Sequence, residues 1–532
     1  MLRFLLLLIL SSGLQADRPN IVFILTDDQR RDSLPVYGNS FVETPHLDRL
    51  AKESVVFDKA SITSAICTPS RASFFSGQYE RRHGVNFNSG TAMSESAWEK
   101  CYPVQLRKSG YFTGYIGKNH LPVGPKGYKT GLMDGSFDYW YAGHGHIRFY
   151  PKEAHQIFKH AKAETQLEII NEGAQNFLSG DEFLEGTQTF LERRDRSKPF
   201  CLSLCLNLPH SAGTGTMKMR PSDDELYRTT YRDRMSEIRF PKTYLARADI
   251  KVPKLPADVL HAQFRQTGYN YVDTPDALRE RMLRQYQTIT GIDRLVGRIR
   301  KALDDLGVAE NTVIIYSSDH GLLLGDHGLG GKALNYEACL AVPLIIHDPR
   351  LEKARRETAL VQSIDLAPTI LDYAEVAVPA EMQGHSLKPL LEGRVDSVRQ
   401  FAFAENLWTN FFGNPRIESL RDGRFKYIRY FENSRDRWQG VTKKTLYKVT
   451  ESMRLDYEAS LTASIRGEDP VYEELYDLIE DPLEKNNLAG DPAHRETLDL
   501  FRRQCQAHVT MARGDDRIPV ATIPLSKNAP SK

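Results

Sequence analysis

Cys67 is followed by a proline, a serine and an arginine in the stretch CTPSR. The continuation SRASFFSG predicts a short helix with Ser70 near its cap. Because a helix N-terminus attracts anions and Arg71 would add a bidentate donor, a tetrahedral anion could be held beside residue 67. Cys67 could also be half of a disulfide or a buried thiol, and this stretch alone leaves those alternatives open.

Two apolar runs end in acidic residues. One leads into Asp27 and Asp28, and the other leads into Asp319 and His320. If both runs are parallel strands, their carboxyl ends lie at the sheet edge where α/β proteins bind ligands. Buried carboxylates are costly unless they are neutralised, and an oxygen-rich set suits a hard divalent ion such as Ca²⁺ or Mg²⁺. For Asp27 and Asp28 alone, a helix cap beside a solvated acid is the alternative.

Four short runs rich in apolar and β-branched residues predict buried parallel strands. Two amphipathic helices are predicted between them, one starting at Thr44-Pro45 and one over residues 276–306, just before Gly307. This alternation predicts an α/β fold in which helices sandwich a large, mostly parallel sheet. The predicted strands span residues 20–25, 199–208, 312–318 and 342–347.

The pattern changes near Asp396, where FAFAEN, SLRDGRFKYIRYF and EELYDLIEDP predict antiparallel strands. A helix is predicted over residues 492–512. We therefore expect a catalytic domain over residues 17–395 and a smaller C-terminal α+β subdomain over residues 396–532. Residues 213–259 are rich in Arg, Asp and Pro, and we expect a long surface excursion near the active face.

Residues 1–16 have the pattern of a secretory signal peptide, with Arg3, an apolar run and a small Ala16 at the cleavage site. No later run approaches about 18 apolar residues, so no stable membrane anchor is expected. We expect a secreted or periplasmic protein, or a lysosomal or extracellular one in a eukaryote.

The charges balance. The chain of 532 residues has 70 basic and 69 acidic residues, and removal of Arg3 leaves 69 of each. A neutral chain has no global reason to bind nucleic acid or an anionic membrane, so anion recognition must be local.

Six cysteines are too few for a disulfide framework in a chain of this length. Cys201 and Cys205 lie four residues apart in a predicted strand, so they should face the same side as small buried residues. The six are at positions 67, 101, 201, 205, 339 and 505.

The frame CTPSRASFFSG resembles the signature of the formylglycine-dependent sulfatases, which is Cys-x-Pro-Ser-Arg with a glycine a few residues on. Further blocks resemble that family in the family's order, over nearly the whole mature chain. The resemblance implies an alkaline-phosphatase-like fold. The blocks are NIVFILTDDQ, GQYERRHGV, GYFTGYIGKNH, LNLPH, SSDHGLLLGDHGLGGK and ELYDLIEDPLEKNNLA.

In that family the cysteine is oxidised to formylglycine, whose aldehyde hydrates to a gem-diol, so the resemblance implies that Cys67 is a precursor. A formylglycine-generating enzyme or an anaerobic sulfatase-maturing enzyme would be the partner during maturation. The resemblance also implies a bound Ca²⁺, or Mg²⁺, and His320 stands where many relatives have Asn. The implied ligands are Asp27, Asp28, residue 67, Asp319 and His320.

The same resemblance implies roles for five further residues. Arg71 and Lys118 would bind the aldehyde hydrate and the sulfate oxygens. His120 would take a proton from the diol when sulfate is expelled. His210 and Lys332 would flank the scissile bond and help the leaving alcohol to acquire a proton.

The alcohol-binding half of the site is less defined. His144, His146 and Arg148 are candidate contacts to a sugar or a second anionic group, although such residues are often plain surface residues. Secretion and a polar, neutral chain favour a sulfated carbohydrate as the substrate.

Two alternative functions remain. One is a phosphomonoester, phosphodiester or phosphonate hydrolase of the same superfamily, a group that often uses two zinc ions. The other is a non-catalytic polysaccharide-binding homologue whose Cys67 is never converted. The single-metal ligand set and the two lysines favour the hydrolysis of sulfate monoesters.

Overall fold

The computed structural model describes residues 18–87, 90–144, 181–210, 225–260, 269–407, 414–432, 451–514 and 521–522. The predicted signal peptide lies outside these residues. Within them, no helix combines the length and apolar character that a membrane crossing requires.

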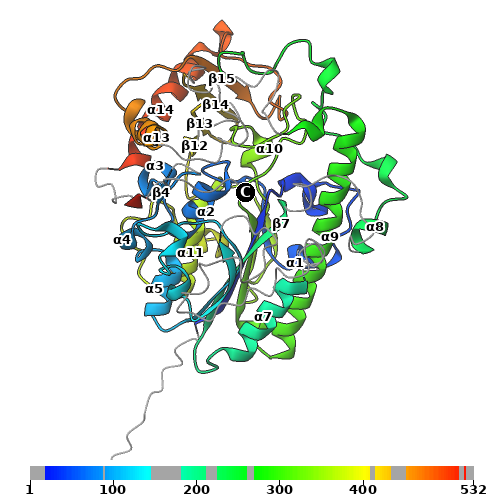
Figure 1. Ribbon diagram of the computed structural model, residues 1–532, viewed down its shortest axis with the longest axis vertical. Helices are drawn as coiled ribbons and strands as arrows, with labels where there is room; N and C mark the ends of the chain where they lie inside the picture. Colours follow the sequence, from blue (N-terminus) through cyan, green and yellow to red (C-terminus); the bar gives the residue numbers. More distant parts are fainter. Residues whose placement is uncertain are drawn as a thin grey trace, which may run out of the picture.

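A sheet of eight strands runs through the centre of the molecule (Figure 1), in the order β10-β2-β9-β8-β1-β7-β5-β6. β1 runs parallel to β7 and β8, and β5 runs parallel to β6 and β7. The large, mostly parallel sheet is therefore confirmed. The strands are β1 (Asn20–Asp27), β2 (Val55–Phe57), β5 (Phe112–Asn119), β6 (Tyr139–His144), β7 (Phe200–Pro209), β8 (Thr312–Ser318), β9 (Leu344–His347) and β10 (Arg355–Glu357).

The predicted parallel direction of the strand at residues 342–347 is wrong. β9 runs antiparallel to both β8 and β2, and Leu344 lies opposite Ser317 near the carboxyl end of β8. A parallel neighbour needs a crossover back to the opposite edge of the sheet. The chain instead stays at the carboxyl edge through Lys332 and then returns directly as β9.

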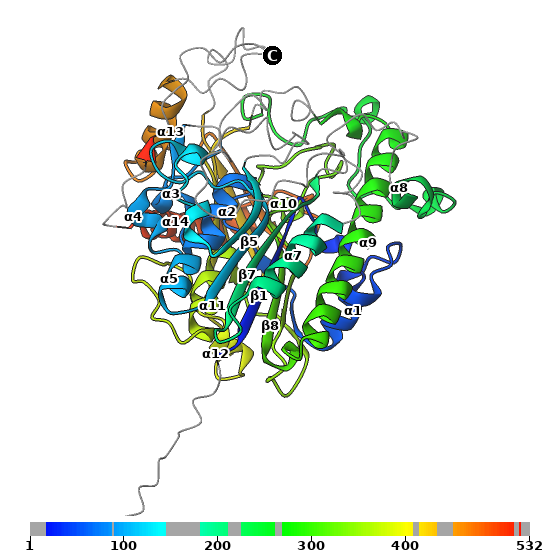
Figure 2. The same ribbon diagram turned by 60° about the horizontal axis from the view of Figure 1, so that its bottom comes forward.

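Helices cover both faces of the sheet, and alternate residues of its strands enter two separate cores (Figures 1 and 2). Cys201 and Cys205 of β7 pack in one core, whereas Leu202 and Leu204 pack in the other, as strand alternation requires. The predicted orientation of the two cysteines is confirmed, and all six cysteines are buried and unpaired. The first core lies under α2 (Cys67–Ser76), α5 (Tyr102–Lys108) and α11 (Leu366–Tyr373), and the second under α1 (Pro45–Lys52), α7 (Asp181–Arg193) and α9 (Pro275–Asp305).

The predicted starts of α1 and α9 are confirmed. α1 begins at Pro45, and α9 begins just after Thr274, whose side chain accepts a hydrogen bond from the backbone N–H of Ala277. The predicted cap at Ser70 is wrong, because α2 begins at Cys67 and places Ser70 in its first turn. Pro69 does not interrupt this start, since the first helical N–H groups have no intrahelical acceptor.

The C-terminal part contains a separate antiparallel sheet, as predicted, in the order β12-β13-β14-β15. α14 (Arg495–Arg513) packs on it through Phe501, which joins a cluster with Phe403 and Leu475. The proposed boundary at residue 396 falls between α12 (Lys388–Leu391) and the first of these strands. The strands are β12 (Ala402–Asn406), β13 (Ile417–Arg421), β14 (Phe425–Tyr430) and β15 (Tyr472–Asp477).

The remaining elements are short. They are β3 (Ala60–Ser61), β4 (Thr91–Ala92), β11 (Val361–Gln362) and β16 (Ala521–Thr522), with α3 (Glu80–His83), α4 (Glu95–Trp98), α8 (Glu225–Thr229) and α10 (Glu337–Leu340). A longer helix, α13 (Glu451–Ala463), lies between β14 and β15 in the chain. Short 3₁₀ turns connect many of them.

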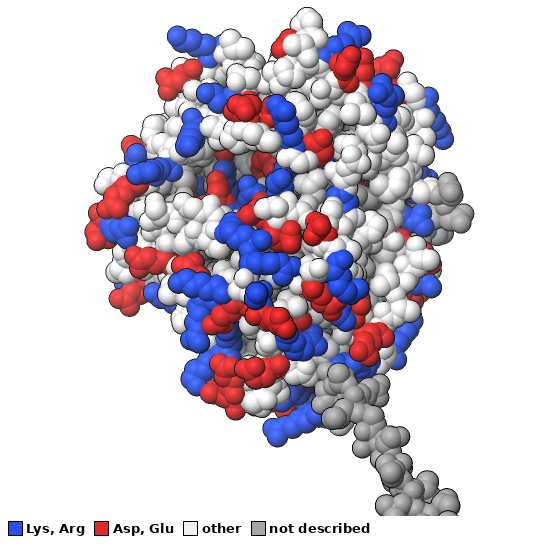
Figure 3. Space-filling model, turned by 180° about the vertical axis from the view of Figure 1, so that it is seen from behind, with Lys and Arg blue, Asp and Glu red and all other residues white. Residues whose placement is uncertain are grey.

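The described part of the predicted excursion, residues 225–259, reaches the segment that follows β8. The backbone N–H of His327 donates to Thr243 O at 3.0 Å, and Lys254 Nζ donates to Tyr476 Oη of β15 at 2.8 Å. The excursion therefore lies beside the carboxyl edge of the sheet. On the face opposite to the view of Figure 1, basic and acidic side chains are interspersed (Figure 3), in keeping with the balanced composition.

Candidate active site

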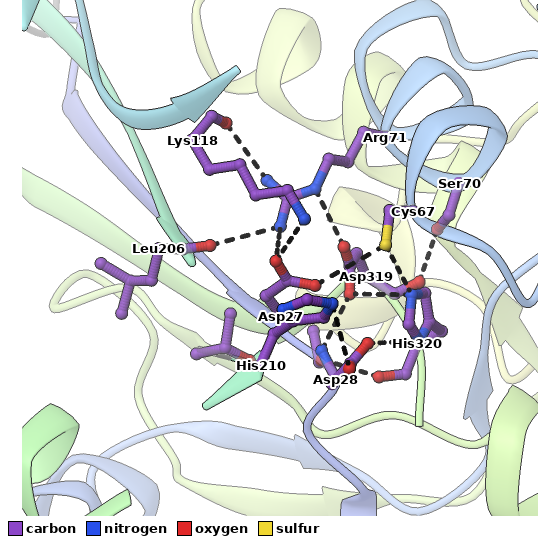
Figure 4. Close-up of polar contacts among 12 residues, drawn as sticks. Asp27, Asp28, Cys67, Ser70, Arg71, Lys118, Leu206, His210, Asp319 and His320 are labelled. Carbon is purple, nitrogen blue, oxygen red and sulfur yellow. Dashed lines mark hydrogen bonds and ion pairs between the residues drawn. The ribbon is translucent and has the colours of Figure 1, made fainter. Parts of the chain in front are cut away.

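The carboxyl ends of β1 and β8 and the first turn of α2 meet at one edge of the sheet (Figure 4). Asp27 ends β1 and Asp28 follows it, while His320 lies just after β8 and Cys67 opens α2. Ligand atoms of these four buried residues lie within 4.8 Å of one another. The structure thus brings together side chains that are up to 293 positions apart, as the positions of Asp27 and His320 show.

Asp28 has a backbone φ of 63°, in the left-handed region. Neighbouring side chains on a regular strand point to opposite faces, so Asp27 and Asp28 could not both face one centre if β1 simply continued. The turn at Asp28 ends this alternation and directs both carboxylates to the same side of the edge. Aspartate tolerates this conformation better than most residues.

Asp319 borders the four-residue group. Its carboxylate accepts hydrogen bonds from the backbone N–H of Asp28 at 3.2 Å and from Arg71 Nε at 2.9 Å. Asp319 Oδ1 also lies 3.6 Å from His320 Nε2. These contacts join the ends of β1 and β8 to α2.

Cys67 is only 1% exposed, and its sulfur is surrounded by candidate ligands. Sγ lies 3.3 Å from His320 Nε2 and 3.8 Å from Asp27 Oδ1, and it accepts a hydrogen bond from Lys332 Nζ at 3.2 Å. The next turn of the helix is fixed by Ser70, whose hydroxyl donates to Asp319 O at 2.5 Å.

Each of the three buried carboxylates of the site contacts a cationic side chain. Such pairing offsets much of the cost of burying charge. The pairs are Lys118 with Asp27, Lys332 with Asp28 at 2.7 Å, and Arg71 with Asp319 at 2.9 Å.

These cations keep two of the carboxylates ionised. Burial alone would raise the pKa of Asp27, but Lys118, His210 and Arg71 hold it well below its ordinary value. Burial likewise opposes ionisation of Asp28, whereas Lys332 and two histidines lower its pKa to about 2. Both residues are therefore anionic at neutral pH, which is the state that binds a cation.

Two further histidines face the same edge. His120 follows β5, and its ring packs edge-on against Phe87 with the centroids 5.4 Å apart. Burial, with Lys118 next in importance, lowers the pKa of His120 well below its ordinary value. His210 follows β7 with Nε2 3.7 Å from Asp28 Oδ2, and burial lowers its pKa to about 3. Both imidazoles are thus neutral and able to accept a proton.

Lys332 lies in the segment between β8 and β9, which packs on the C-terminal sheet. Asn335 is fully buried, and its Nδ2 donates to Ser419 Oγ at 2.8 Å and to Ala404 O at 3.2 Å. The C-terminal sheet therefore helps to place Lys332 at the site. Other contacts of this segment with the sheet are Tyr336 with Glu474, and Glu337 with Arg421 and Lys426.

Some features that shape the site were not predicted. Arg71 is oriented by the backbone oxygens of Lys118 and Leu206, at 3.4 and 3.3 Å. A Cβ at Gly321 would lie 2.1 Å from Ala338 O, so glycine is needed where the chain turns away from His320. Gly321 lies within the block SSDHGLLLGDHGLGGK, which is the signal that could have indicated it.

The three predicted substrate contacts are not located. His144 ends β6, where its backbone pairs with Asn119, and its side chain is outside the described part of the structure. His146 and Arg148 lie outside the described residues. A cavity of about 890 Å³ lies beside the site, and Asp28, Pro209 and Arg234 are among the residues that line it.

The donor set fits a hard divalent cation. Asp27 and Asp28 supply ionised oxygens and His320 a nitrogen, all within 4.8 Å, and oxygen-rich sets of this kind suit Ca²⁺ or Mg²⁺. The nearby Asp319 carboxylate adds a further oxygen beside the group.

Comparison with protein families assigns the class. The model of the family described as "Sulfatase" matches residues 19–376, which is more than half of the chain. A second model, described as "N-sulphoglucosamine sulphohydrolase, C-terminal", matches residues 325–447. The chain belongs to the sulfatase family, and it is a sulfuric ester hydrolase of the alkaline-phosphatase-like superfamily.

Individual relatives agree with this class. The chain is 26% identical to an N-acetylglucosamine-6-O-sulfatase of Bacteroides thetaiotaomicron, over 90% of this chain and 83% of the relative. A solved protein in complex with its substrate D-glucosamine-2-N,6-O-disulfate has a TM-score of 0.65 at 23% identity, and the match covers 94% and 99% of the two chains. The phosphonate monoester hydrolase of Agrobacterium radiobacter has a TM-score of 0.66 at 21% identity, with 93% and 96% covered. These two structures support the fold.

Proposed function

We propose that the protein removes sulfate from a sulfated carbohydrate by cleaving the O–S bond of a sulfate monoester, with a formylglycine made from Cys67 and a bound divalent cation. The observation that supports this most directly is the position of Cys67. Its sulfur lies between the ligand atoms of Asp27 and His320 and accepts a hydrogen bond from Lys332. A buried thiol with a merely structural role has no need of these neighbours.

Three cationic side chains at the site are suited to bind a group with several anionic oxygens, such as a sulfate ester. Arg71, Lys118 and Lys332 surround residue 67 at the base of the site, and each is held by a carboxylate. We assign the binding and orientation of the sulfate oxygens to these three cations. Because their carboxylate partners fix them in advance, little reorganisation is needed when the ester binds.

The two neutral histidines suit proton transfer at different atoms. His210 is the more exposed and lies beside Asp28, and we assign to it the uptake of a proton from solvent and the transfer of that proton to the leaving alcohol oxygen. His120 is buried against Phe87, and we assign to it the acceptance of a proton from the hydroxyl at residue 67. A basic sugar alkoxide needs such assistance more than an acidic phenolate does.

Formylglycine, once formed and hydrated, supplies one hydroxyl that can accept the sulfuryl group and a second that permits its release. A divalent cation, Ca²⁺ or Mg²⁺, supplies charge that polarises the ester and acidifies a hydroxyl. The residues that would hold this cation are Asp27, Asp28, residue 67, Asp319 and His320.

The substrate class rests on the relatives. The N-acetylglucosamine-6-O-sulfatase and the protein bound to a glucosamine disulfate both act on sulfated amino sugars, as their names state. We propose a sulfated carbohydrate as the substrate of this chain, and aryl sulfates as artificial ones. The predicted signal peptide, residues 1–16, would direct the protein to a secreted, periplasmic or lysosomal compartment and would be removed after Ala16.

Mass spectrometry of the peptide that contains residue 67 tests the central step. We expect the mass of formylglycine, which is lighter than that of cysteine, in protein expressed with a maturation enzyme. Protein expressed without that enzyme is the control. Full activity of chains that carry only unmodified cysteine would contradict the proposal.

Phosphonate or phosphate ester hydrolysis is the second candidate, because the structural likeness to the phosphonate monoester hydrolase is as high as that to the sugar-sulfate-binding protein. Matched kinetics on 4-nitrophenyl sulfate, 4-nitrophenyl phosphate and a phenyl phosphonate monoester distinguish the two. We expect kcat/KM to be at least about 100-fold higher for the sulfate. A preference for either phosphorus ester would favour the second candidate.

A further inference from the structure

Arg281 differs from the other buried arginines among the described residues. It is 2% exposed, and no carboxylate in the described part of the chain lies within ion-pair distance of its guanidinium, whereas every other buried arginine there forms an ion pair. Its Nε and Nη1 are buried without a hydrogen-bond partner. An uncompensated buried charge is costly, and a bound anion would compensate the charge of this guanidinium. The paired arginines are Arg71, Arg81, Arg284, Arg416, Arg421 and Arg429.

Arg281 lies at the carboxyl edge of the central sheet. α9 ends at Asp305, at the edge where β8 begins, and α9 is longer than the strands it covers (Figure 1). At about 1.5 Å per residue, the first turns of α9 therefore extend past the opposite edge, where the active site lies.

One aromatic side chain connects Arg281 to the active site. The guanidinium carbon lies 5.0 Å from the ring centroid of Tyr271, and Tyr271 Oη donates to Gly330 O at 2.7 Å. Gly330 is two residues before Lys332, whose ammonium group contacts Cys67. Arg281 is thus connected, through the Tyr271 ring, to the segment that carries Lys332.

The neighbouring turns of α9 face the chain that follows His210. Thr288, seven residues after Arg281 and on the same helical face, forms a hydrogen bond with Tyr227 Oη of α8 at 2.7 Å. α8 lies beside α9 (Figures 1 and 2) and is the first described element after His210. Arg281 therefore lies next to the segment that carries Lys332, and its helix also packs against α8.

We propose that Arg281, packed on Tyr271, is an anion subsite for a second negative group of the substrate. The ligand class is a sugar with two anionic groups: the sulfate ester that is cleaved and either another sulfate or a carboxylate. Arg281 would bind the second group and determine specificity, without contact to the reacting atoms. This inference rests on the proposed function and narrows its substrate class.

Calorimetric binding to full-length, Ca²⁺-replete protein in a Cys67→Ala background tests the subsite without turnover. The probes are glucosamine 6-sulfate, glucosamine-2-N,6-O-disulfate and glucuronic acid 2-sulfate, which separate one sulfate, two sulfates, and a sulfate with a carboxylate. With Arg281 present, we expect at least one dianionic probe to bind at least about tenfold more tightly than the monosulfate. Arg281→Gln should remove this preference, and Arg281→Lys should keep part of it.

Arg279→Gln is the matched control. Arg279 lies on the same helix, packs on Phe240 and forms an ion pair with Asp276, so its replacement should leave the preference unchanged. Thermal unfolding of Arg281→Met provides a second measurement. Removal of an uncompensated charge should not lower Tm, whereas a purely structural role on Tyr271 predicts a lower Tm and an unchanged preference.

The subsite is refuted if Arg281→Gln retains the preference, or if the parent protein binds all three probes equally. Its failure can be distinguished from failure of the proposed function. Hydrolysis of 4-nitrophenyl sulfate by the mature chain with native Cys67 tests the proposed function. The binding ratios test the subsite, and they can be measured whether or not that hydrolysis occurs.

Discussion

Lys332 Nζ lies 3.2 Å from Cys67 Sγ, although the two residues are 265 positions apart in the chain. The same ammonium group donates to Asp28 Oδ1 at 2.7 Å, so one lysine links residue 67 to a candidate metal ligand. A single cation can therefore respond both to the modification of Cys67 and to the binding of a metal.

Cys67→Ser should abolish turnover while it leaves the fold intact. Serine can accept a sulfuryl group, but it lacks the second hydroxyl of a hydrated aldehyde that releases it. We expect a sulfated serine in the mass spectrum after incubation with 4-nitrophenyl sulfate. Cys67→Ala should be equally inactive and carry no such adduct, and sustained turnover by either variant would exclude the proposed mechanism.

Asp27→Asn and Asp28→Asn should each reduce metal affinity and most of the activity, because each removes one anionic ligand. Metal content by mass spectrometry and kcat for 4-nitrophenyl sulfate are the measurements. Chelation should have the same effect on the parent chain, and Ca²⁺ should restore activity better than Zn²⁺. Asp326→Asn is a control on the segment after β8, and it should retain the metal. Undiminished activity after verified removal of all metal would disprove the assignment.

His210→Ala should affect substrates according to their leaving groups. A sugar alkoxide is a poor leaving group and needs a proton, whereas 4-nitrophenolate leaves with little assistance. We therefore expect a loss in kcat/KM at least about tenfold larger for a sugar sulfate than for 4-nitrophenyl sulfate. Equal losses for both substrates would remove His210 from the role of proton donor.

His120→Ala should instead slow both substrates to a similar turnover. If His120 acts after the alcohol has left, one equivalent of 4-nitrophenol should be released in a burst before the slow phase. Rapid mixing with absorbance detection gives the burst amplitude. A burst in His210→Ala and leaving-group dependence in His120→Ala would mean that the two assignments are reversed.

Asn335→Ala should lower kcat through the position of Lys332. The change removes hydrogen bonds to Ser419 and Ala404 and should destabilise the fold by about 1–3 kcal/mol. We expect kcat to fall more than KM changes, with the metal still bound. Ser419→Ala leaves the bond to Ala404 O available and should have a smaller effect. If Asn335→Ala lowers only Tm, the C-terminal sheet does not position Lys332.

Glu80 should make the protein less stable as pH rises. It is fully buried beside Ser64 and Asn86, and burial, with the charge of Glu405, raises its pKa to about 8. The folded chain thus retains a proton that the unfolded chain loses near pH 4.5. The contribution of Glu80 to the free energy of unfolding is fully present below that pH. As the pH rises to about 8, this contribution decreases by at most about 1.4 kcal/mol per pH unit. The free energy of unfolding of Glu80→Gln, measured with a denaturant, should not show this decrease with pH. Identical pH profiles for Glu80→Gln and the parent protein would contradict the raised pKa of Glu80.

The sequence predicted four of the eight strands of the central sheet, β1, β7, β8 and β9, because these runs are short, apolar and β-branched, whereas β10 (Arg355–Glu357) has no such pattern. It also predicted that Asp27, Asp28, Asp319 and His320 meet, since each pair follows a strand and parallel strands end together. The direction of β9 could not be predicted, because an apolar run of this length has the same pattern in either orientation. The start of α2 was misplaced because Ser70 is a good cap by residue type, yet its hydroxyl bonds to Asp319 O, a contact invisible in the local sequence.

The position of Lys332 could not be predicted from its neighbouring residues, and only the family resemblance indicated it. His210 directly follows the predicted strand β7, but Lys332 lies in an irregular segment and is placed by tertiary contacts such as those of Asn335 with the C-terminal sheet. Arg281 gave no signal at all, because an arginine in an amphipathic helix is typical of a solvated face. Only its burial without a carboxylate among the described residues distinguishes it.

Because the C-terminal sheet supports Lys332, the site around Cys67 is complete only after the C-terminal strands have been synthesised. Cys67 leaves the ribosome hundreds of residues before Ser419, yet the segment that closes over it is fastened by Asn335 to β12 and β13. In the finished protein Cys67 is 1% exposed, so another enzyme can no longer reach it. Under the proposed conversion of Cys67 to formylglycine, late translation of the C-terminal strands would leave an interval in which the nascent chain presents Cys67 for oxidation, and faster folding would shorten that interval.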